Sequence, residues 1–189
     1  MLRSFVTWFS FLIMATALAA CCGSTACECD DQYADAVGLQ FSADTTGPNP
    51  VGFRAREVQN VYLVRVPLDT TQRPGADTVL LVRPVARYSQ PVVINNTTPF
   101  AQAGNRKLDS YSYLLYLAPS RTSKVHSFDL RIDSVQLNTV FRAEGCCTCF
   151  DNNNKLVYIN GNPTPQNQTA PKDSKGSDAL RPILVERKP

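Results

Sequence analysis

The chain has 189 residues, of which 43% are apolar and 19% charged, which is enough for one domain with a hydrophobic core. It carries 19 basic and 16 acidic residues. Removal of residues 1–20 would take away only one charged residue, Arg3, and would leave 18 basic against 16 acidic residues. This near-neutral balance argues against a nucleic-acid binder, which needs a concentrated basic face.

The first 20 residues have the pattern of a signal peptide. Arg3 supplies a positive start, and residues 5–20 form an apolar run that ends in small residues. A helix that spans a bilayer needs about 20 apolar residues, so the shorter run favours cleavage over an uncleaved anchor. Residues 18–21 (LAAC) resemble the lipobox of bacterial lipoproteins. The resemblance implies that Cys21 is acylated, with fatty acids such as palmitate, and that these chains hold the protein to a membrane.

Residues 21–34 follow as a short, lipidated and cysteine-rich tether, and the predicted strands begin after it. Residues 37–43 alternate between apolar and polar side chains, as a half-buried strand does. Residues 58–66 are rich in β-branched and aromatic side chains, which also predicts a strand. The apolar run at residues 78–83 predicts a central strand, and residues 91–94 predict a short edge strand.

Residues 111–117 (YSYLLYL) predict a strong strand. Tyr111 and Tyr113 lie on the same face of it as two leucines, so we expect them in the core rather than on a sugar-stacking platform. Tyr116 lies on the opposite face.

Residues 125–141 also alternate, but their phase slips by one residue near Asp133 and Ser134. Because such a slip turns every following side chain to the other face, a bulge or tight turn is expected there. Before the slip, His126 lies on the apolar face of the predicted strand. Residues 155–160 form the last clear strand.

Seven or eight short strands and no helical period predict an all-β fold. We expect a single antiparallel β-sandwich, immunoglobulin-like or transthyretin-like, over residues 35–161. Residues 162–189 are expected to form a mostly disordered tail, because residues 162–177 are polar and rich in proline. An apolar patch at residues 180–185 predicts an additional edge strand within this tail.

If Cys21 is lipidated, six cysteines remain, in two clusters that lie more than a hundred residues apart. The clusters are Cys22, Cys27, Cys29 and Cys146, Cys147, Cys149. Adjacent residues have Cα atoms about 3.8 Å apart, closer than the usual disulfide span of about 4.4 Å or more, so bonds within a cluster are hard to form. We therefore expect all six cysteines to form disulfides between the clusters in an oxidising compartment, with the pairing left open.

Two other chemistries are open to these cysteines. Several thiolates could bind zinc or cuprous copper. The C-x-x-C pair at residues 146–149 could be a redox motif, but a thioredoxin-like motif would begin a helix, and residues 150–154 predict a turn instead. We favour structural disulfides and expect no bound metal or cofactor.

No catalytic constellation stands out, so we do not expect an enzyme. The single histidine, His126, is expected at the edge of the core. Asp109, Asp129, Asp133 and Glu144 could supply the carboxylate pair of a glycosidase, but no spacing singles out two of them. The motifs of serine hydrolases, P-loop proteins, dinucleotide-binding proteins and zinc proteases are missing from the sequence.

The stretch CECDD at residues 27–31 and EGCCTCFDNNNKLVYING at residues 144–161, with the β-rich middle, resemble small cysteine-containing envelope lipoproteins of unknown function from Bacteroidota. The resemblance implies a β-sandwich anchored at the outer membrane, facing the periplasm or the cell surface, and implies no activity. We expect a structural or binding module whose partner is an envelope protein or a glycan. Thiolate metal binding is the alternative, and an uncharacterised envelope enzyme comes third.

Overall fold

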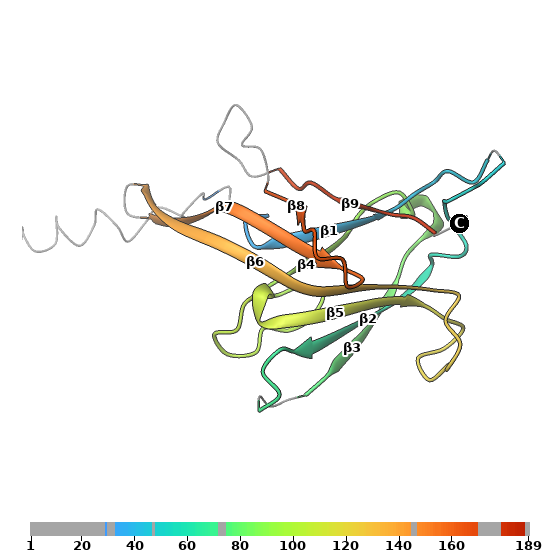
Figure 1. Ribbon diagram of the computed structural model, residues 1–189, viewed down its shortest axis with the longest axis horizontal. Coiled ribbons are helices and arrows are strands. Elements are labelled where there is room, and N and C mark those ends of the chain that lie inside the picture. Colours follow the sequence, from blue (N-terminus) through green and yellow to red (C-terminus); the bar gives the residue numbers. More distant parts are fainter. Residues whose placement is uncertain are drawn as a thin grey trace, which may run out of the picture.

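The computed structural model describes residues 29, 33–46, 48–71, 75–144, 147–169 and 179–187 (Figure 1). These residues contain nine strands and two short 3-10 turns, and none of them is in an α-helix. The strands are β1 (Ala36–Phe41), β2 (Asn60–Pro67), β3 (Asp77–Val82), β4 (Val92–Asn95), β5 (Tyr111–Leu117), β6 (Phe128–Glu144), β7 (Cys147–Ile159), β8 (Gln166–Asn167) and β9 (Ile183–Val185). The 3-10 turns are η1 (Val85–Arg87) and η2 (Leu108–Ser110).

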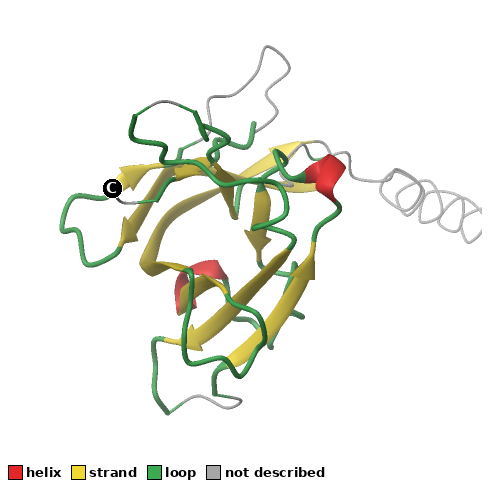
Figure 2. Ribbon diagram, turned by 90° about the vertical axis from the view of Figure 1, so that its right-hand side faces the viewer, coloured by secondary structure: helices red, strands yellow, loops and turns green. Residues whose placement is uncertain are grey.

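The strands form two sheets that pack face to face (Figure 2). The larger sheet has the strand order β3-β2-β5-β6-β7-β8, and all of its neighbours are antiparallel. The smaller sheet has the order β4-β1-β9, in which β1 and β9 run parallel. The expected all-β sandwich is therefore confirmed, with one parallel pair and short additional strands.

The core lies between the sheets and takes side chains from both of them. Leu39 and Ile94 of the smaller sheet and Leu63 and Leu115 of the larger sheet are at most 1% exposed. Burial of each such side chain stabilises the fold by about 1.5–3 kcal/mol, before the entropy cost is counted. Tyr111 and Tyr113 are both 3% exposed and belong to this core, as the alternation predicts.

The predicted phase slip in the sixth strand is a β-bulge. Ile132 pairs with Ile159 and Ser134 pairs with Tyr158, so Asp133 is an extra residue on β6. The Asp133 carboxylate accepts a hydrogen bond of 2.7 Å from the backbone N–H of Gly161, which closes the loop after β7 against the bulge. The expectation from the sequence is confirmed at the residue where the pattern changes phase.

The prediction of a turn at residues 150–154 is wrong, because these residues belong to β7. They pair with the far half of β6 as far as Glu144 and Cys147, with a second register shift that leaves Asn153 as an extra residue. Three consecutive asparagines disfavour a strand locally, but the backbone of β6 offers them a continuous ladder of partners. The bulge accommodates the asparagine run without ending the strand.

The far half of this hairpin forms a two-stranded arm. Pairing between β5 and β6 covers only residues 128–132 of β6, whereas β6 pairs with β7 up to Glu144. In Figure 1 the arm extends away from the other strands of the larger sheet. A two-stranded ribbon is marginally stable by itself, so the arm needs contacts from elsewhere in the chain.

The strand at residues 77–82 differs from the expected central strand, because β3 is the edge of the larger sheet and pairs only with β2 among the described strands. Leu80 and Val82 are 46% and 72% exposed. An apolar run alone does not reveal whether a strand has one neighbour or two.

The C-terminal part of the chain contributes more to the fold than its composition predicts. Gln166–Asn167 pair with β7 as β8, and Gln168 is 8% exposed. Ile183 and Val185 are 2% and 0% exposed in β9, which confirms the edge strand expected within residues 180–185. Residues 170–178 and 188–189 lie outside the described residues.

Candidate functional site

A disulfide joins the start of the domain to the two-stranded arm. Cys29 and Cys149 are bonded across a sequence separation of 120 residues, with Cα atoms 5.4 Å apart. The prediction that the two cysteine clusters are linked is confirmed for this pair. Cys147 is disulfide-bonded as well. Cys21, Cys22, Cys27 and Cys146 lie outside the described residues, and so do the expected signal peptide at residues 1–20 and most of the tether.

This bond bears on the two other chemistries considered for the cysteines. The sulfur atoms of Cys29 and Cys149 are bonded to each other, so neither is a thiolate able to bind a metal. In the part of the chain that the structure describes, no three His, Cys, Asp or Glu side chains gather as a metal site. Cys149 lies within a strand, as the third residue of β7, rather than at the start of a helix, which is not the thioredoxin-like setting.

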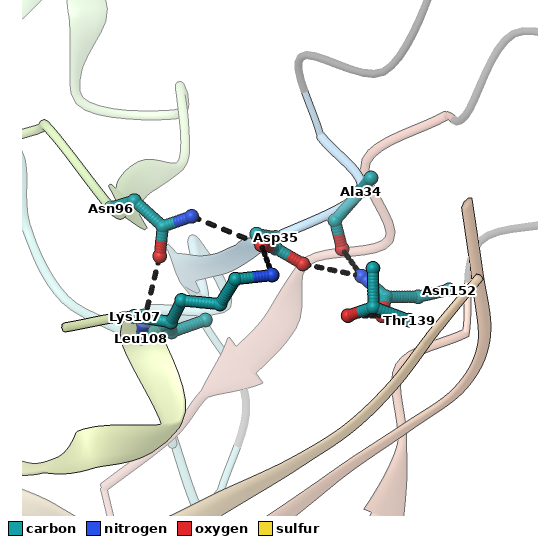
Figure 3. A network of polar contacts seen from close by, with 7 residues as sticks. All are labelled: Ala34, Asp35, Asn96, Lys107, Leu108, Thr139 and Asn152. Atoms are coloured by element: carbon teal, nitrogen blue, oxygen red, sulfur yellow. Dashed lines mark hydrogen bonds and ion pairs between the residues drawn. The ribbon is translucent and has the colours of Figure 1, made fainter. Parts of the chain in front are cut away.

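Asp35 is the centre of a polar network (Figure 3). Its side chain is 13% exposed, and its carboxylate accepts a hydrogen bond of 3.0 Å from the Asn96 amide. The Lys107 ammonium lies 3.4 Å from the same oxygen. Asn96 in turn accepts a hydrogen bond of 2.8 Å from the backbone N–H of Leu108, so the carboxylate fixes the loop that carries both partners.

Asn152 connects this network to the arm. Its amide N–H donates to the second Asp35 oxygen at 2.7 Å and also to the backbone carbonyl of Ala34. Its amide oxygen accepts a hydrogen bond of 2.9 Å from the Thr139 hydroxyl on β6. The strand bulge lies at the next residue, Asn153, so the asparagine run serves to tie the arm to the segment before β1.

Lys155 also binds the segment before β1. The residue is 2% exposed, and its ammonium donates to the backbone carbonyls of Tyr33 and Ala36 at 2.8 and 2.7 Å. A buried ammonium is costly without such partners, so these bonds fix where the chain enters β1. The disulfide, Asn152 and Lys155 together attach Cys29 and residues 33–36 to β7.

A hollow of about 640 Å³ opens beside the Asp35 network. Its walls come from the segment before β1, from the loop between β4 and η2, and from β7. The lining is mostly short and polar and includes Asn95, Thr97, Gln102, Asn105 and Lys107. The Phe150 ring, 36% exposed, forms one side, and the Lys107 ammonium lies 5.6 Å from the centre of that ring.

The lining of the hollow carries amide and hydroxyl groups, one ammonium and one aromatic ring. Some of these groups are already engaged, because the Asn95 side-chain oxygen accepts hydrogen bonds from Thr97 and Thr98 and the Gln102 amide donates to the Gly104 carbonyl. The only carboxylate in its lining, Asp35, is already satisfied by its neighbours. No pair of carboxylates and no nucleophile with an adjacent base lines it. The arrangement suits the binding of a polar, uncharged molecule.

The sequence did not point to this site. Asp35, Asn96, Lys107 and Asn152 come from four separate segments, and only Asn152 lies in a stretch that the sequence singles out, at residues 144–161. The asparagine run at residues 152–154 is the only local signal, because it is unusual in a strand, and by composition it predicts a turn. Close contact among these residues depends on the register between β6 and β7 and on the disulfide, which no local pattern encodes.

The side chains singled out from the sequence lie elsewhere. His126 precedes β6 and stacks on Tyr116, with ring centres 4.1 Å apart, on the outer side of the larger sheet. The sequence predicts His126 on the apolar face of a strand, and the structure corrects this prediction. The His126 Nδ1 atom lies 3.9 Å from the Asp129 carboxylate. The Asp133 carboxylate lies 3.1 Å from the Arg131 guanidinium, and Asp109 belongs to η2. The side chain of Glu144 lies outside the described residues.

Comparison with protein-family models, with curated proteins and with solved structures finds no match for this chain. Within the described ranges, no helix has the length and apolar character needed to cross a bilayer.

Proposed function

We propose that this chain is a lipid-anchored protein of the cell envelope that binds a carbohydrate in the hollow beside Asp35. The observation that carries the binding function is the composition of the hollow. Amide, hydroxyl and ammonium groups surround about 640 Å³, and an aromatic ring forms one side.

The ligand class follows from the chemistry of these groups. Amide side chains donate and accept at once, which matches adjacent hydroxyl groups of a sugar. The face of Phe150 can cover the apolar C–H face of a pyranose ring, as aromatic faces do with apolar partners. A strongly anionic ligand fits less well, because Lys107 is the only cation in the lining and is already paired with Asp35.

The Asp35 network supports this proposal because it makes the hollow rigid. The loop that carries Asn95, Gln102 and Asn105 is fixed by the bonds of Asn96 and Lys107 to Asp35. Binding to a preformed site loses less entropy than binding that must order a loop.

The anchor part of the proposal depends on Cys21. The LAAC pattern supports acylation, and the Cys29–Cys149 disulfide would hold the domain within eight residues of the lipid. Metabolic labelling with a fatty acid should label the wild-type protein and the Cys22→Ala variant, but not Cys21→Ala. If Cys21→Ala is still acylated and sediments with membranes, the anchor proposal is wrong.

The binding part is tested by calorimetry and NMR titration with neutral oligosaccharides, including glucans, mannans and peptidoglycan fragments. We expect the Lys107→Met substitution to weaken binding about tenfold, since a hydrogen bond from a charged donor contributes about 1.5–3 kcal/mol. Lys124→Met removes an exposed lysine that does not line the hollow, so it should bind like the wild type. Absence of binding to every saccharide at millimolar concentration, with the fold intact, would refute the proposal.

A further inference from the structure

The end of the β6–β7 arm carries an exposed apolar patch, which we call the aromatic tip and define as Phe141 and Phe150. Phe141 is 66% exposed and Phe150 is 36% exposed. Phe141 and Phe150 are direct partners in the ladder, and their ring centres lie 5.2 Å apart. Exposed aromatic side chains in one patch at the end of an extension are typical of a surface that meets a partner.

The position of the tip relative to the proposed lipid limits what that partner can be. Cys29 is bonded to Cys149, the residue directly before Phe150. Cys29 lies eight positions after Cys21, and a fully extended chain of eight Cα–Cα steps reaches at most about 29 Å. A flexible chain of eight residues has a typical end-to-end distance of about 16 Å. An acylated Cys21 would therefore keep the tip close to the bilayer surface.

Both basic side chains near the rings are paired with carboxylates. The Lys107 ammonium lies over the Phe150 ring and 3.4 Å from Asp35, and Arg142 pairs with Asp151 at 3.6 Å. The case for a membrane therefore depends on the rings, because aromatic side chains are enriched at membrane interfaces, where they enter the headgroup region.

We propose that the aromatic tip rests in the headgroup region of the phospholipid bilayer that carries the lipid anchor. The inference rests on the proposed acylation of Cys21 and adds the orientation of the domain. Anchor and tip together give two points of attachment, so the arm lies against the bilayer and the opposite end of β6 points away from it.

The experiment uses the acylated full-length protein, purified and reconstituted into phosphatidylethanolamine–phosphatidylglycerol vesicles. Trp8 is the only tryptophan of the chain and lies in the signal peptide, so the processed protein has none. Phe141→Trp places one fluorophore at the tip without changing a residue that lines the hollow. Val125→Trp is the matched control, because Val125 is 76% exposed in the loop before β6, at the other end of that strand. Thirteen residues of strand between Phe128 and Phe141 correspond to about 43 Å.

We expect vesicles with lipids brominated near the headgroup to remove about half of the fluorescence of the Phe141→Trp variant, with a blue-shifted emission, because a ring in the interface lies about 5–10 Å deep. The Val125→Trp variant should lose none. If the protein is acylated and sediments with the vesicles but the Phe141→Trp fluorescence is unquenched, the tip inference is overturned and the anchor stands. Equal quenching in both variants also overturns it. If the protein is neither acylated nor vesicle-bound, the anchor proposal fails and the tip inference falls with it. Unfolding curves that match the wild type confirm that both variants are folded.

Discussion

Removal of the Cys29–Cys149 disulfide should be the most destabilising change among those considered for this fold. The Cys29→Ala and Cys149→Ala double variant leaves no unpaired thiol at either position. The bond closes a loop with a sequence separation of 120 residues, which contains both sheets apart from most of β7, β8 and β9. Its removal also frees the segment before β1 from the two-stranded arm.

The magnitude follows from the length of that loop. In the chain-entropy model, a loop of this size lowers the entropy of the unfolded chain enough to stabilise the folded state by about 5 kcal/mol. The disulfide of Cys147 remains in the double variant, so the loss should be smaller, about 2–4 kcal/mol. For a chain of this size, each kcal/mol corresponds to about 2–4 °C in Tm, so the melting temperature should fall by roughly 5–15 °C.

Urea unfolding followed by circular dichroism measures the effect. The oxidised wild type should unfold at the highest urea concentration, the double variant at a lower one, and the fully reduced wild type at or below the variant. The slope of the free energy of unfolding against urea should rise in the variant, because its unfolded chain exposes more surface. If the variant and the oxidised wild type share one midpoint and one slope, the disulfide does not constrain the unfolded chain and the reasoning is refuted.

Two further predictions concern single residues. Burial raises the pKa of Tyr113 well above that of a free tyrosine. The folded protein therefore keeps a proton that the unfolded chain loses above about pH 10. The free energy of unfolding should fall as the pH rises above about 10. In alkaline unfolding curves, Tyr113→Phe should remove this pH dependence, at a cost of about 1 kcal/mol for the lost hydrogen bond to the Leu108 carbonyl. If the free energy of unfolding of the variant falls with pH as steeply as that of the wild type, Tyr113 is not the group responsible. A Cβ atom at Gly52 would lie 2.5 Å from the backbone of Asp44, so Gly52→Ala should lower the free energy of unfolding by about 1–3 kcal/mol. Gly75→Ala meets no atom within 4 Å and should be nearly neutral in the same denaturation assay; equal effects of the two substitutions would contradict the steric argument.

Local patterns predicted most of the strands and some of their details. The alternation in residues 111–117 placed Tyr111 and Tyr113 in the core and Tyr116 on the other face, where it stacks on Tyr62 with ring centres 5.0 Å apart. The change of phase at Asp133 located a bulge to the residue. These features depend only on which neighbours along the chain are apolar, and such neighbours are visible in the sequence.

The same local signals failed where a distant segment decided the outcome. The asparagine run at residues 152–154 has the composition of a turn, yet it lies in a strand because β6 supplies a ladder and Asp35 a partner for Asn152. The terminal segment at residues 183–185 is short and lies after a polar stretch, yet it is buried because it adds to the edge of β1. In both places tertiary contacts outweigh the local preference.

By itself, the sequence determined that the chain forms an all-β sandwich and that its cysteines lie in two clusters suited to a cross-link. Only the tertiary structure decided that Cys29 pairs with Cys149, that β3 is an edge strand, and that a hollow lies beside Asp35. The difference has a physical cause. Hydrophobic alternation is a property of adjacent residues, whereas a site built from Asp35, Lys107 and Asn152 exists only after strand order and register bring three distant segments together.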